Sequence, residues 1–223
     1  HDPFPVTGWD AVVWIVGNAT QTALHYRTAY GMKLVAYSGP ETGQRDHKAY
    51  VLTSGGCRFV IMGGVAPDSP LLDHHRAHGD GVSDISLEVP DVDVCIAHAI
   101  RVGARVLVEP HDVSDEPGTI RTATIAAYGD TVHSLVDRSR YHGPYLPGFV
   151  AYEDTLVGDR QPVFWALDHV VGNVELGRMD EWVEFYHRVM GFTNMAEFIG
   201  DDIATDYSAL MSKVVASGNH RVK

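Results

Sequence analysis

The segment Asp10-Ala11-Val12-Val13, near the start of the chain, returns far downstream as Asp168-His169-Val170-Val171. A Gly-Asn pair follows each copy, as Gly17-Asn18 in the first and Gly172-Asn173 in the second. Self-similarity at a long period is the signature of a duplicated structural unit. The fold is therefore predicted to be built from copies of one module, with each copy opening on this segment.

A second match supports the duplication and also shows where the copies differ. His25-Tyr26 through Gly31-Met32 resembles Phe185-Tyr186 through Gly191-Phe192, and each lies 160 residues from its counterpart. The clearest difference is that the first copy has Ala11 where the second has His169. This contrast suggests a scaffold copy and a working copy.

The pattern of apolar residues predicts the order strand, helix, three strands for the module. In the first unit we expect a strand at 10–16, a helix at 20–30 capped by Asn18 and ended by Gly31, and strands at 33–37, 49–53 and 58–62. In the second we expect a strand at 82–89, a helix from Pro90-Asp91 to Gly103, and strands at 105–109, 120–127 and 132–136. Strand-rich units joined by short loops favour an α+β fold of repeated βαβββ modules.

A third unit begins after a segment with no sustained period. Residues 138–161 are rich in Gly, Pro, Tyr and Asp, which is typical of a connecting segment. Beyond it we expect a strand at 165–174, a helix at 178–190, and strands at 193–199 and 208–216. We therefore predict a domain at 1–150, a linker at 151–164, and the start of a second domain at 165–223. One more strand is due, so the sequence reads as the N-terminal part of a longer protein.

Composition excludes several classes of partner. Apolar residues make up 45% and charged residues 21% of the chain, as in an ordinary globular protein. A formal charge of −12 argues against nucleic acid and anionic membranes, which attract clustered Lys and Arg. No apolar run approaches the ~20 residues of a membrane span, and no secretory signal pattern is present. Cys57 and Cys95 lie in apolar runs and are predicted to be buried, reduced thiols of a cytoplasmic protein.

Histidines are the candidate chemical groups. A lone His in an apolar strand, such as His169, is commonly a buried core residue with one hydrogen-bond partner. Because the first copy has Ala at this place, the fold does not require the imidazole, and a metal-binding role stays open. One histidine is not a site, since zinc or iron needs at least three protein ligands.

The other histidine-rich stretch carries a weaker signal. His74 and His78 are spaced to share a helix face, but the Glu of a zinc-protease motif is replaced by His75. A solvated helix end is the favoured interpretation there, and His133 is assigned no role. We find no Gly-x-Ser-x-Gly elbow and no phosphate-binding glycine loop.

Longer stretches of the chain resemble the 4-hydroxyphenylpyruvate dioxygenase family. The segments that carry the resemblance are 167–174 (Leu-Asp-His-Val-Val-Gly-Asn-Val), the Glu-Phe-Tyr run of the following helix, Gly191-Phe192, Gly200-Asp201-Asp202, 207–212, 16–19, 37–43 (Tyr-Ser-Gly-Pro-Glu-Thr-Gly), 78–82, 128–131, 135–137 and 144–148 (Pro-Tyr-Leu-Pro-Gly). The resemblance is collinear over essentially the whole chain, and it looks closest to the bacterial, actinomycete-type members.

The resemblance implies a vicinal-oxygen-chelate fold with strongly curved mixed sheets, a non-catalytic N-terminal domain and a catalytic C-terminal domain. In such enzymes two His and one Glu hold Fe(II), and His169 matches the first His ligand. Ser212 matches a serine that orients the substrate, and Val171 matches a residue lining the iron pocket. The implied reaction converts 4-hydroxyphenylpyruvate and O2 to homogentisate and CO2 in tyrosine catabolism, in a protein that is typically a homo-oligomer. The other two ligands would lie beyond Lys223, so this fragment alone is expected to be inactive.

Two alternatives remain at this stage. Hydroxymandelate synthase shares the scaffold, the metal and the substrate but hydroxylates the benzylic carbon. A non-catalytic module would use the first 150 residues to bind a small ligand without metal, or would serve chiefly for assembly. Reading the frame past Lys223 for a second His and a later Glu is the observation that separates enzyme from module.

Overall fold

A computed structural model of the chain describes residues 2–198 and 211–223. The first unit comprises β1 (Gly8–Ile15), α1 (Ala19–Tyr30), β2 (Lys33–Ser38), the short 3-10 helix η1 (Pro40–Thr42), β3 (His47–Ser54) and β4 (Cys57–Gly64). Helix α2 (Pro70–His78) leads into the second unit, which comprises β5 (Gly81–Glu88), α3 (Val92–Arg101), β6 (Val106–Asp115), β7 (Gly118–Ala126) and β8 (Val132–Asp137). After them come β9 (Val150–Ala151), α4 (Met179–Met190), β10 (Thr193–Phe198) and β11 (Ser212–Ala216).

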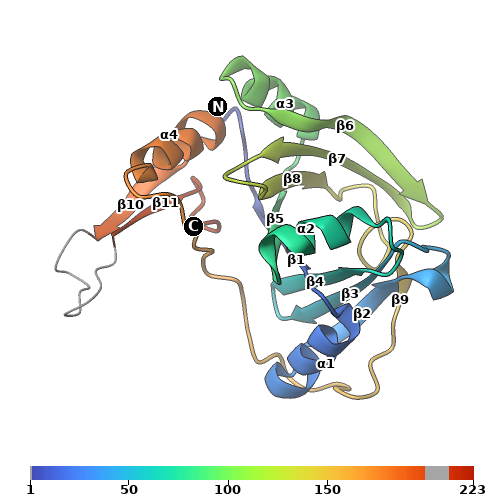
Figure 1. The fold of residues 1–223 in the computed structure, drawn as a ribbon. Coiled ribbons are helices and arrows are strands. Elements are labelled where there is room, and N and C mark those ends of the chain that lie inside the picture. The colour runs from blue at the N-terminus through green and yellow to red at the C-terminus, as the bar shows by residue number, and fades with distance from the viewer. Residues whose placement is uncertain (1, 199–210) are drawn as a thin grey trace, which may run out of the picture.

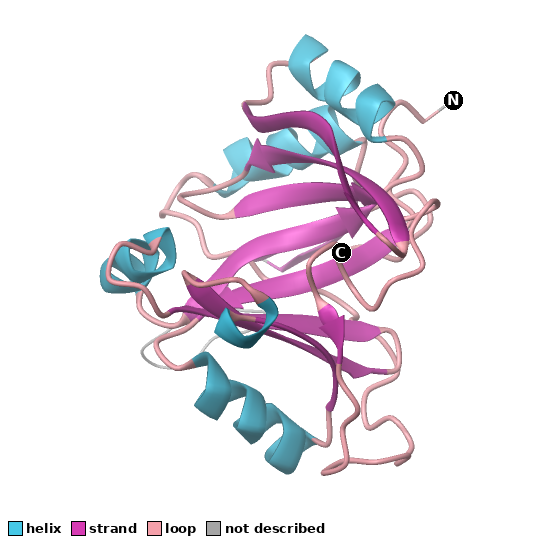
Figure 2. Ribbon diagram, turned by 90° about the vertical axis from the view of Figure 1, so that its right-hand side faces the viewer, coloured by secondary structure: helices cyan, strands magenta, loops and turns pink. Residues whose placement is uncertain are grey.

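The eight strands of the first two units, together with β9, form one nine-stranded sheet with the order β6-β7-β8-β5-β1-β4-β3-β2-β9. In each unit the first strand runs parallel to the last, β1 beside β4 and β5 beside β8, while the other neighbours within the unit are antiparallel. The units meet where β1 and β5 pair antiparallel. The sheet is strongly curved, with α1 and α3 at its opposite ends (Figures 1 and 2). This confirms the predicted α+β fold of βαβββ modules.

The helix boundaries follow from local capping. The Asn18 side chain accepts a hydrogen bond from the backbone N–H of Gln21 at 3.0 Å, and Gly31 ends α1 with φ of 65°. Asp91 caps α3 in the same way, through the N–H of Val94 at 3.0 Å. These caps satisfy amide groups that the first turn of a helix leaves without a partner, and they lie where the sequence predicts them.

Two faces of the sheet are packed by different parts of the chain. On the outer face, α1 covers a cluster that includes Met32, Leu34 and Ile61, and α3 covers one that includes Leu87 and Ile125. The inner face of the first unit packs a third cluster, which includes residues from the segment after β8. Because both faces of the sheet are covered, most of these strands contain runs of consecutive apolar residues as well as stretches in which apolar and polar residues alternate.

The third unit differs from the prediction. Helix α4 forms as expected, and β10 pairs antiparallel with β11 in a sheet of their own. The predicted strand at 165–174 does not form. By analogy with β1, such a strand needs neighbours on both sides, whereas its backbone hydrogen bonds here are Gly56 N–H to Trp165 O, at 2.7 Å, and Val170 N–H to Lys223 O, at 3.2 Å. Residues 199–210, which include Gly200-Asp201-Asp202 and most of the 207–212 stretch of the family resemblance, lie outside the described residues.

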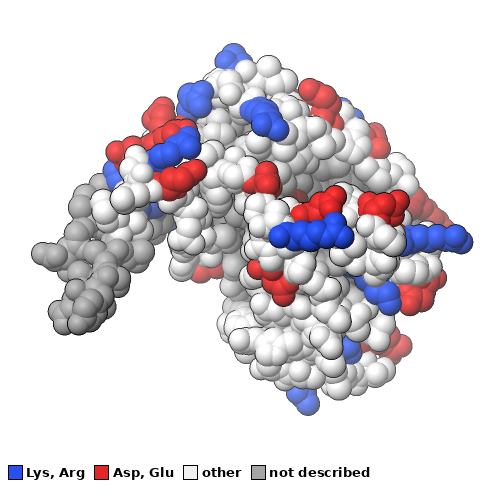
Figure 3. Space-filling model, in the orientation of Figure 1, with Lys and Arg blue, Asp and Glu red and all other residues white. Residues whose placement is uncertain are grey.

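The surface charges and the environment of the cysteines agree with what the composition predicts. Within residues 2–198 and 211–223, no helix has the length and apolar character that crossing a bilayer requires. On the face drawn in Figure 3, acidic and basic side chains are interspersed rather than gathered into a basic patch. Cys57 and Cys95 are both buried and free, as predicted, and burial raises the pKa of the Cys95 thiol to about 12.

Candidate functional site

His169 lies in an extended segment that leads to α4, with its side chain 57% exposed. Its Nδ1 is 2.9 Å from Oδ2 of Asp168. The other carboxylate oxygen of Asp168 accepts a hydrogen bond from Lys223 Nζ at 2.6 Å. Lys223 and His169, in that order of effect, lower the pKa of Asp168. Asp168 is therefore held as a carboxylate that fixes the orientation of the imidazole.

This arrangement matches one member of a metal site. Histidines that bind metals through one ring nitrogen usually donate the other ring N–H to a carboxylate or carbonyl, which fixes the tautomer. With Nδ1 turned to Asp168, Nε2 is the nitrogen that His169 presents outward. Within the described part of the chain, however, no three His, Cys, Asp or Glu side chains lie close enough together to hold a metal ion. The described residues therefore do not by themselves assemble an iron centre.

Val171 and Ser212 are the other two residues that the family resemblance singles out. Val171 is 66% exposed, two residues after His169 in the same extended segment. Ser212 is half-buried at the start of β11, where its backbone pairs with Phe198. The structure records no hydrogen bond joining His169 to Ser212 among its described residues, so the roles of all three remain predictions.

A cleft of about 490 Å³ lies beside this segment. Its walls come from the start of β1, the β3–β4 turn and the last residues of the chain, and they include Trp9, Gly56, Asp168, Arg221 and Lys223. Asp168 faces this cleft, whereas His169 is not among the residues that line it. The cleft carries both signs of charge and is bordered by Asp168 rather than by the candidate ligand.

The corresponding place in the first unit is closed. Ala11 is the counterpart of His169, and it lies with Val13 and Val60 in the inner-face cluster. Tyr145 is 5% exposed in the same cluster, with Leu146 and Phe149 packed against it. The segment after β8 therefore fills the hollow of the first unit with the protein's own side chains. Ala11 itself is only 1% exposed among these described neighbours.

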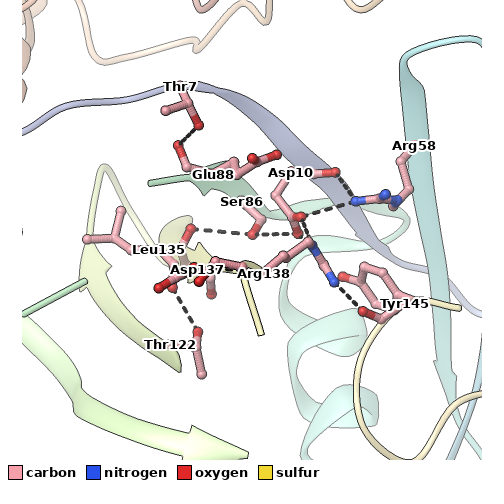
Figure 4. Close-up of polar contacts among 12 residues, drawn as sticks. Thr7, Asp10, Arg58, Ser86, Glu88, Thr122, Leu135, Asp137, Arg138 and Tyr145 are labelled. Atoms are coloured by element: carbon pink, nitrogen blue, oxygen red, sulfur yellow. Dashed lines mark hydrogen bonds and ion pairs between the residues drawn. The ribbon is translucent and has the colours of Figure 1, made fainter. Parts of the chain in front are cut away.

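A buried carboxylate, Asp10, fixes this filling segment (Figure 4). Arg58 Nη1 donates to Asp10 Oδ1 at 3.0 Å, and Arg138 donates to both carboxylate oxygens, one of the bonds being 2.9 Å. Arg138 also donates to the carbonyl of Tyr145 and lies over its ring, 5.0 Å from the centroid. Ser86 Oγ adds a donor to Asp10 at 3.3 Å. Asp10 is thus a structural anchor, as expected for the carboxylate shared by both copies.

The histidine-rich stretch forms the end of α2, as predicted. His78 Nε2 lies 2.8 Å from Asp130, and His75 Nε2 lies 2.8 Å from Asp80, which also accepts from the N–H of Gly17. These contacts tie the end of α2 to neighbouring loops. Described residues around them supply no metal-binding group of three.

Sequence analysis assigns His133 no role, yet the structure buries it on β8, at 3% exposure, in contact with α4. The only advance signal was its place in an alternating strand, which fixes a face of the sheet but not the neighbour on that face. The partner, Tyr186, lies on α4. Sequence spacing alone could not bring the two together.

No family model matches the chain. Three curated relatives are named 4-hydroxyphenylpyruvate dioxygenase. The protein from Yarrowia lipolytica is 38% identical over 97% of this chain and 57% of its own length. The Dictyostelium discoideum protein is 39% identical over 97% and 60%, and the Caenorhabditis elegans protein is 37% identical over 96% and 56%. These relatives come from a yeast, an amoeba and a nematode, and the actinomycete-type subgroup stays a prediction.

Solved structures show the same fold. A triple mutant of 4-hydroxymandelate synthase from Streptomyces coelicolor superposes with a TM-score of 0.84 at 24% identity, covering 98% of this chain and 61% of that one. A xylose isomerase-like TIM barrel/4-hydroxyphenylpyruvate dioxygenase fusion protein gives a TM-score of 0.64 at 16% identity over 100% of this chain and 32% of that one. The chain spans less than two thirds of the length of the curated relatives it matches. It has the vicinal-oxygen-chelate fold, and over nearly all of its length it is homologous to somewhat more than half of the 4-hydroxyphenylpyruvate dioxygenase sequence.

Proposed function

We propose that the chain is part of an Fe(II)-dependent dioxygenase that converts 4-hydroxyphenylpyruvate and O2 to homogentisate and CO2. The observation that carries this proposal is identity of 37–39% to proteins of that name over 96–97% of the chain. The Asp168–His169 pair supports it, because a carboxylate on Nδ1 is the usual environment of a metal-binding imidazole.

In this proposal four residues of the second copy have defined roles. His169 is one of the iron ligands, and Asp168 holds its ring so that Nε2 is presented. Ser212 orients the substrate through its hydroxyl, and Val171 contributes an apolar wall that excludes water. Iron bound by a complete set of ligands supplies the activation of O2, while the protein supplies geometry and a dry pocket. The enzyme is proposed to be a cytoplasmic homo-oligomer.

The first unit is proposed to be a scaffold. The closed hollow beside Ala11, filled by Tyr145 and its neighbours, argues against the alternative in which residues 1–150 bind a small ligand there. We propose that residues 1–150 form the non-catalytic domain, 151–164 the linker, and 165–223 the start of the catalytic domain.

The synthase alternative shares scaffold and substrate, and the two differ in product. Its solved relative, at 24% identity, bears on the fold alone, whereas the higher identity to the curated dioxygenases favours homogentisate. Identifying the product separates the two: 4-hydroxymandelate in place of homogentisate would support the synthase.

The test compares this chain with the product of the reading frame extended past Lys223. The 223-residue chain should bind negligible Fe(II) in a titration and show no turnover. The extended protein should bind one Fe(II) per chain, consume O2 and release CO2 with 4-hydroxyphenylpyruvate. His169→Ala should remove iron binding in the extended protein, while the matched change at the exposed His142, His142→Ala, should leave it intact. Tight stoichiometric iron in the 223-residue chain, or full iron binding by His169→Ala, would contradict the proposal.

A further inference from the structure

Three side chains that the proposed reaction does not use form a series of hydrogen bonds between the nine-stranded sheet and α4. His133 on β8 has Nδ1 2.8 Å from the carbonyl oxygen of Ile85, and Nε2 2.9 Å from the hydroxyl of Tyr186. Tyr186 in turn shares a side-chain hydrogen bond with Tyr128, from the loop between β7 and β8. These hydrogen bonds join β8 to α4 through His133, which is buried, and through Tyr186 and Tyr128, which are half-buried.

The chemistry of the partners fixes the positions of the protons on His133 and Tyr186. A carbonyl only accepts, so Nδ1 of His133 carries the hydrogen that it donates to Ile85. Burial lowers the pKa of His133 to about 4, so the ring is neutral near pH 7 and Nε2 is an acceptor. The Tyr186 hydroxyl must then donate its hydrogen to Nε2. Burial is also the largest cause of the raised pKa of Tyr186, which keeps this hydroxyl protonated as a donor.

The far end of the chain touches the segment that carries the candidate ligand. A Cβ placed on Gly172 would lie 2.3 Å from the Tyr128 hydroxyl, so any side chain at this position would force the tyrosine ring to move. Gly172 is three residues from His169. The Tyr128 ring also meets Trp182 of α4 edge-on, with centroids 5.5 Å apart. One tyrosine thus contacts both the His169 segment and the helix that follows it.

We propose that Tyr128, Tyr186 and His133 form a clasp that positions α4 and the His169 segment on the first sheet. As a positioning device for the iron ligand, the clasp rests on the proposed function; as a contact between α4 and the sheet, it does not. The first copy provides the comparison. Tyr26 is the counterpart of Tyr186, and it packs against Trp14 and Phe59 of its own unit rather than reaching another part of the chain.

Two readouts on the 223-residue chain test the clasp without any metal. The first is the nitrogen NMR signature of the His133 ring, assigned by its loss in His133→Gln. At pH 7 it should show a protonated Nδ1 and a bare, hydrogen-bonded Nε2, and Tyr186→Phe should shift the Nε2 signal. A ring protonated on Nε2, or one that Tyr186→Phe leaves unchanged, would overturn the proposal.

The second readout is backbone amide exchange under native conditions. Tyr186→Phe should speed exchange in α4 at least tenfold relative to β3 and β4, whereas Tyr26→Phe, the same chemical change in the other copy, should leave α4 unchanged. Tyr128→Phe should shift the amide resonance of Gly172. Equal effects of Tyr186→Phe and Tyr26→Phe on α4 would reduce the clasp to general packing. Because neither readout involves iron, the clasp can hold while the dioxygenase proposal fails, and the reverse.

Discussion

Asp84 is a carboxyl group on the inner face of β5, where its Oδ1 accepts a hydrogen bond from the backbone N–H of Ser134 at 2.9 Å. Burial is the largest cause that raises its pKa from 3.8 to about 6, against the opposing effect of the Ser134 hydrogen bond; the charge on Asp10 adds a smaller rise. The folded protein therefore favours the neutral acid. Its contribution to stability is fully present below pH 3.8 and is lost as the pH rises through 6.

We expect Asp84→Asn to stabilise the protein at pH 7. The amide is neutral and its oxygen can still accept from Ser134, so the substitution removes a penalty of about 3 kcal/mol, the size of the pKa shift. Chemical denaturation at a series of pH values measures it. The gain should shrink below pH 6 and vanish near pH 4, and the fully exposed Asp159, changed to Asn, is the control. A stabilisation that is constant with pH would contradict the assignment.

At the residue scale, the sequence indicates which residues are important better than it indicates which side chains surround them. The Ala11–His169 difference points to the working copy, and the shared carboxylate of Asp10 and Asp168 points to a structural role, which the structure confirms for Asp10. The sequence could not show that Arg58 and Arg138 bind Asp10, because these two residues lie 48 and 128 positions away from it in the chain. Such pairs form only when the sheet is assembled.

At the scale of elements, β1 to β8 and the helices α1, α3 and α4 are predicted, because their period and end signals are local. The segment 165–174 has the same apolar pattern as β1 and remains irregular. The difference lies in the partners: β1 has β4 and β5 on its two sides. A strand pattern states a preference, and neighbouring strands decide whether it is realised.

The segment after β8 illustrates how an irregular stretch can be essential to a sheet. Tyr145→Ala should leave a hollow beside Ala11 and remove the ring under Arg138, so we expect it to lower the free energy of unfolding by about 3–5 kcal/mol, as for other large aromatic truncations. Urea denaturation measures this. Tyr152→Ala, at a half-exposed tyrosine a few residues on, should cost far less. Equal losses would mean that Tyr145 does not fill the inner face.

The predicted linker is held in place by a buried carboxylate. Asp154 is 2% exposed, receives a hydrogen bond from Arg27 Nε at 2.9 Å, and accepts from three backbone amides that include Leu34 N–H at 2.9 Å. Burial alone would raise its pKa, but the Arg27 and backbone hydrogen bonds outweigh it and lower the pKa from 3.8 to about 2. Residues 151–164 therefore form a strap against α1 and β2.

Asp154→Asn should destabilise the protein at pH 7 by about 2 kcal/mol, the size of the pKa shift. The carboxylate contributes stability above pH 3.8 that is lost as the pH falls through about 2, so the gap between variant and wild type should narrow below pH 4. Thermal unfolding at pH 7 and pH 3 checks this. Asp159→Asn, in the same strap but exposed, should change neither value.

At the scale of the whole molecule, the duplication predicts repeated βαβββ units but not how the third unit packs against the first two. Val189, Met190, Phe192 and Val222 pack into the same cluster as Leu87 and Cys95 of the second unit. Arg188 donates to the carbonyl of Val102, and His98 reaches the carbonyl of Arg188 at 3.3 Å. These contacts lie between amphipathic surfaces, and sequence periodicity identifies each surface without pairing them.

A chain that ends after Phe164 tests the predicted division directly. It keeps all nine strands of the sheet, the Tyr145 filling and the Asp154 anchor, so we expect it to unfold in one cooperative step. Its stability should fall, because removing α4 and β11 uncovers apolar surface on α3 and opens His133 to water. The dye ANS should therefore bind to this shorter chain, and the pKa of His133 should rise from about 4 toward the ordinary value of about 6.5. A shorter chain that lacks a cooperative transition would show that residues 165–223 complete the first domain, and the boundary would have to move.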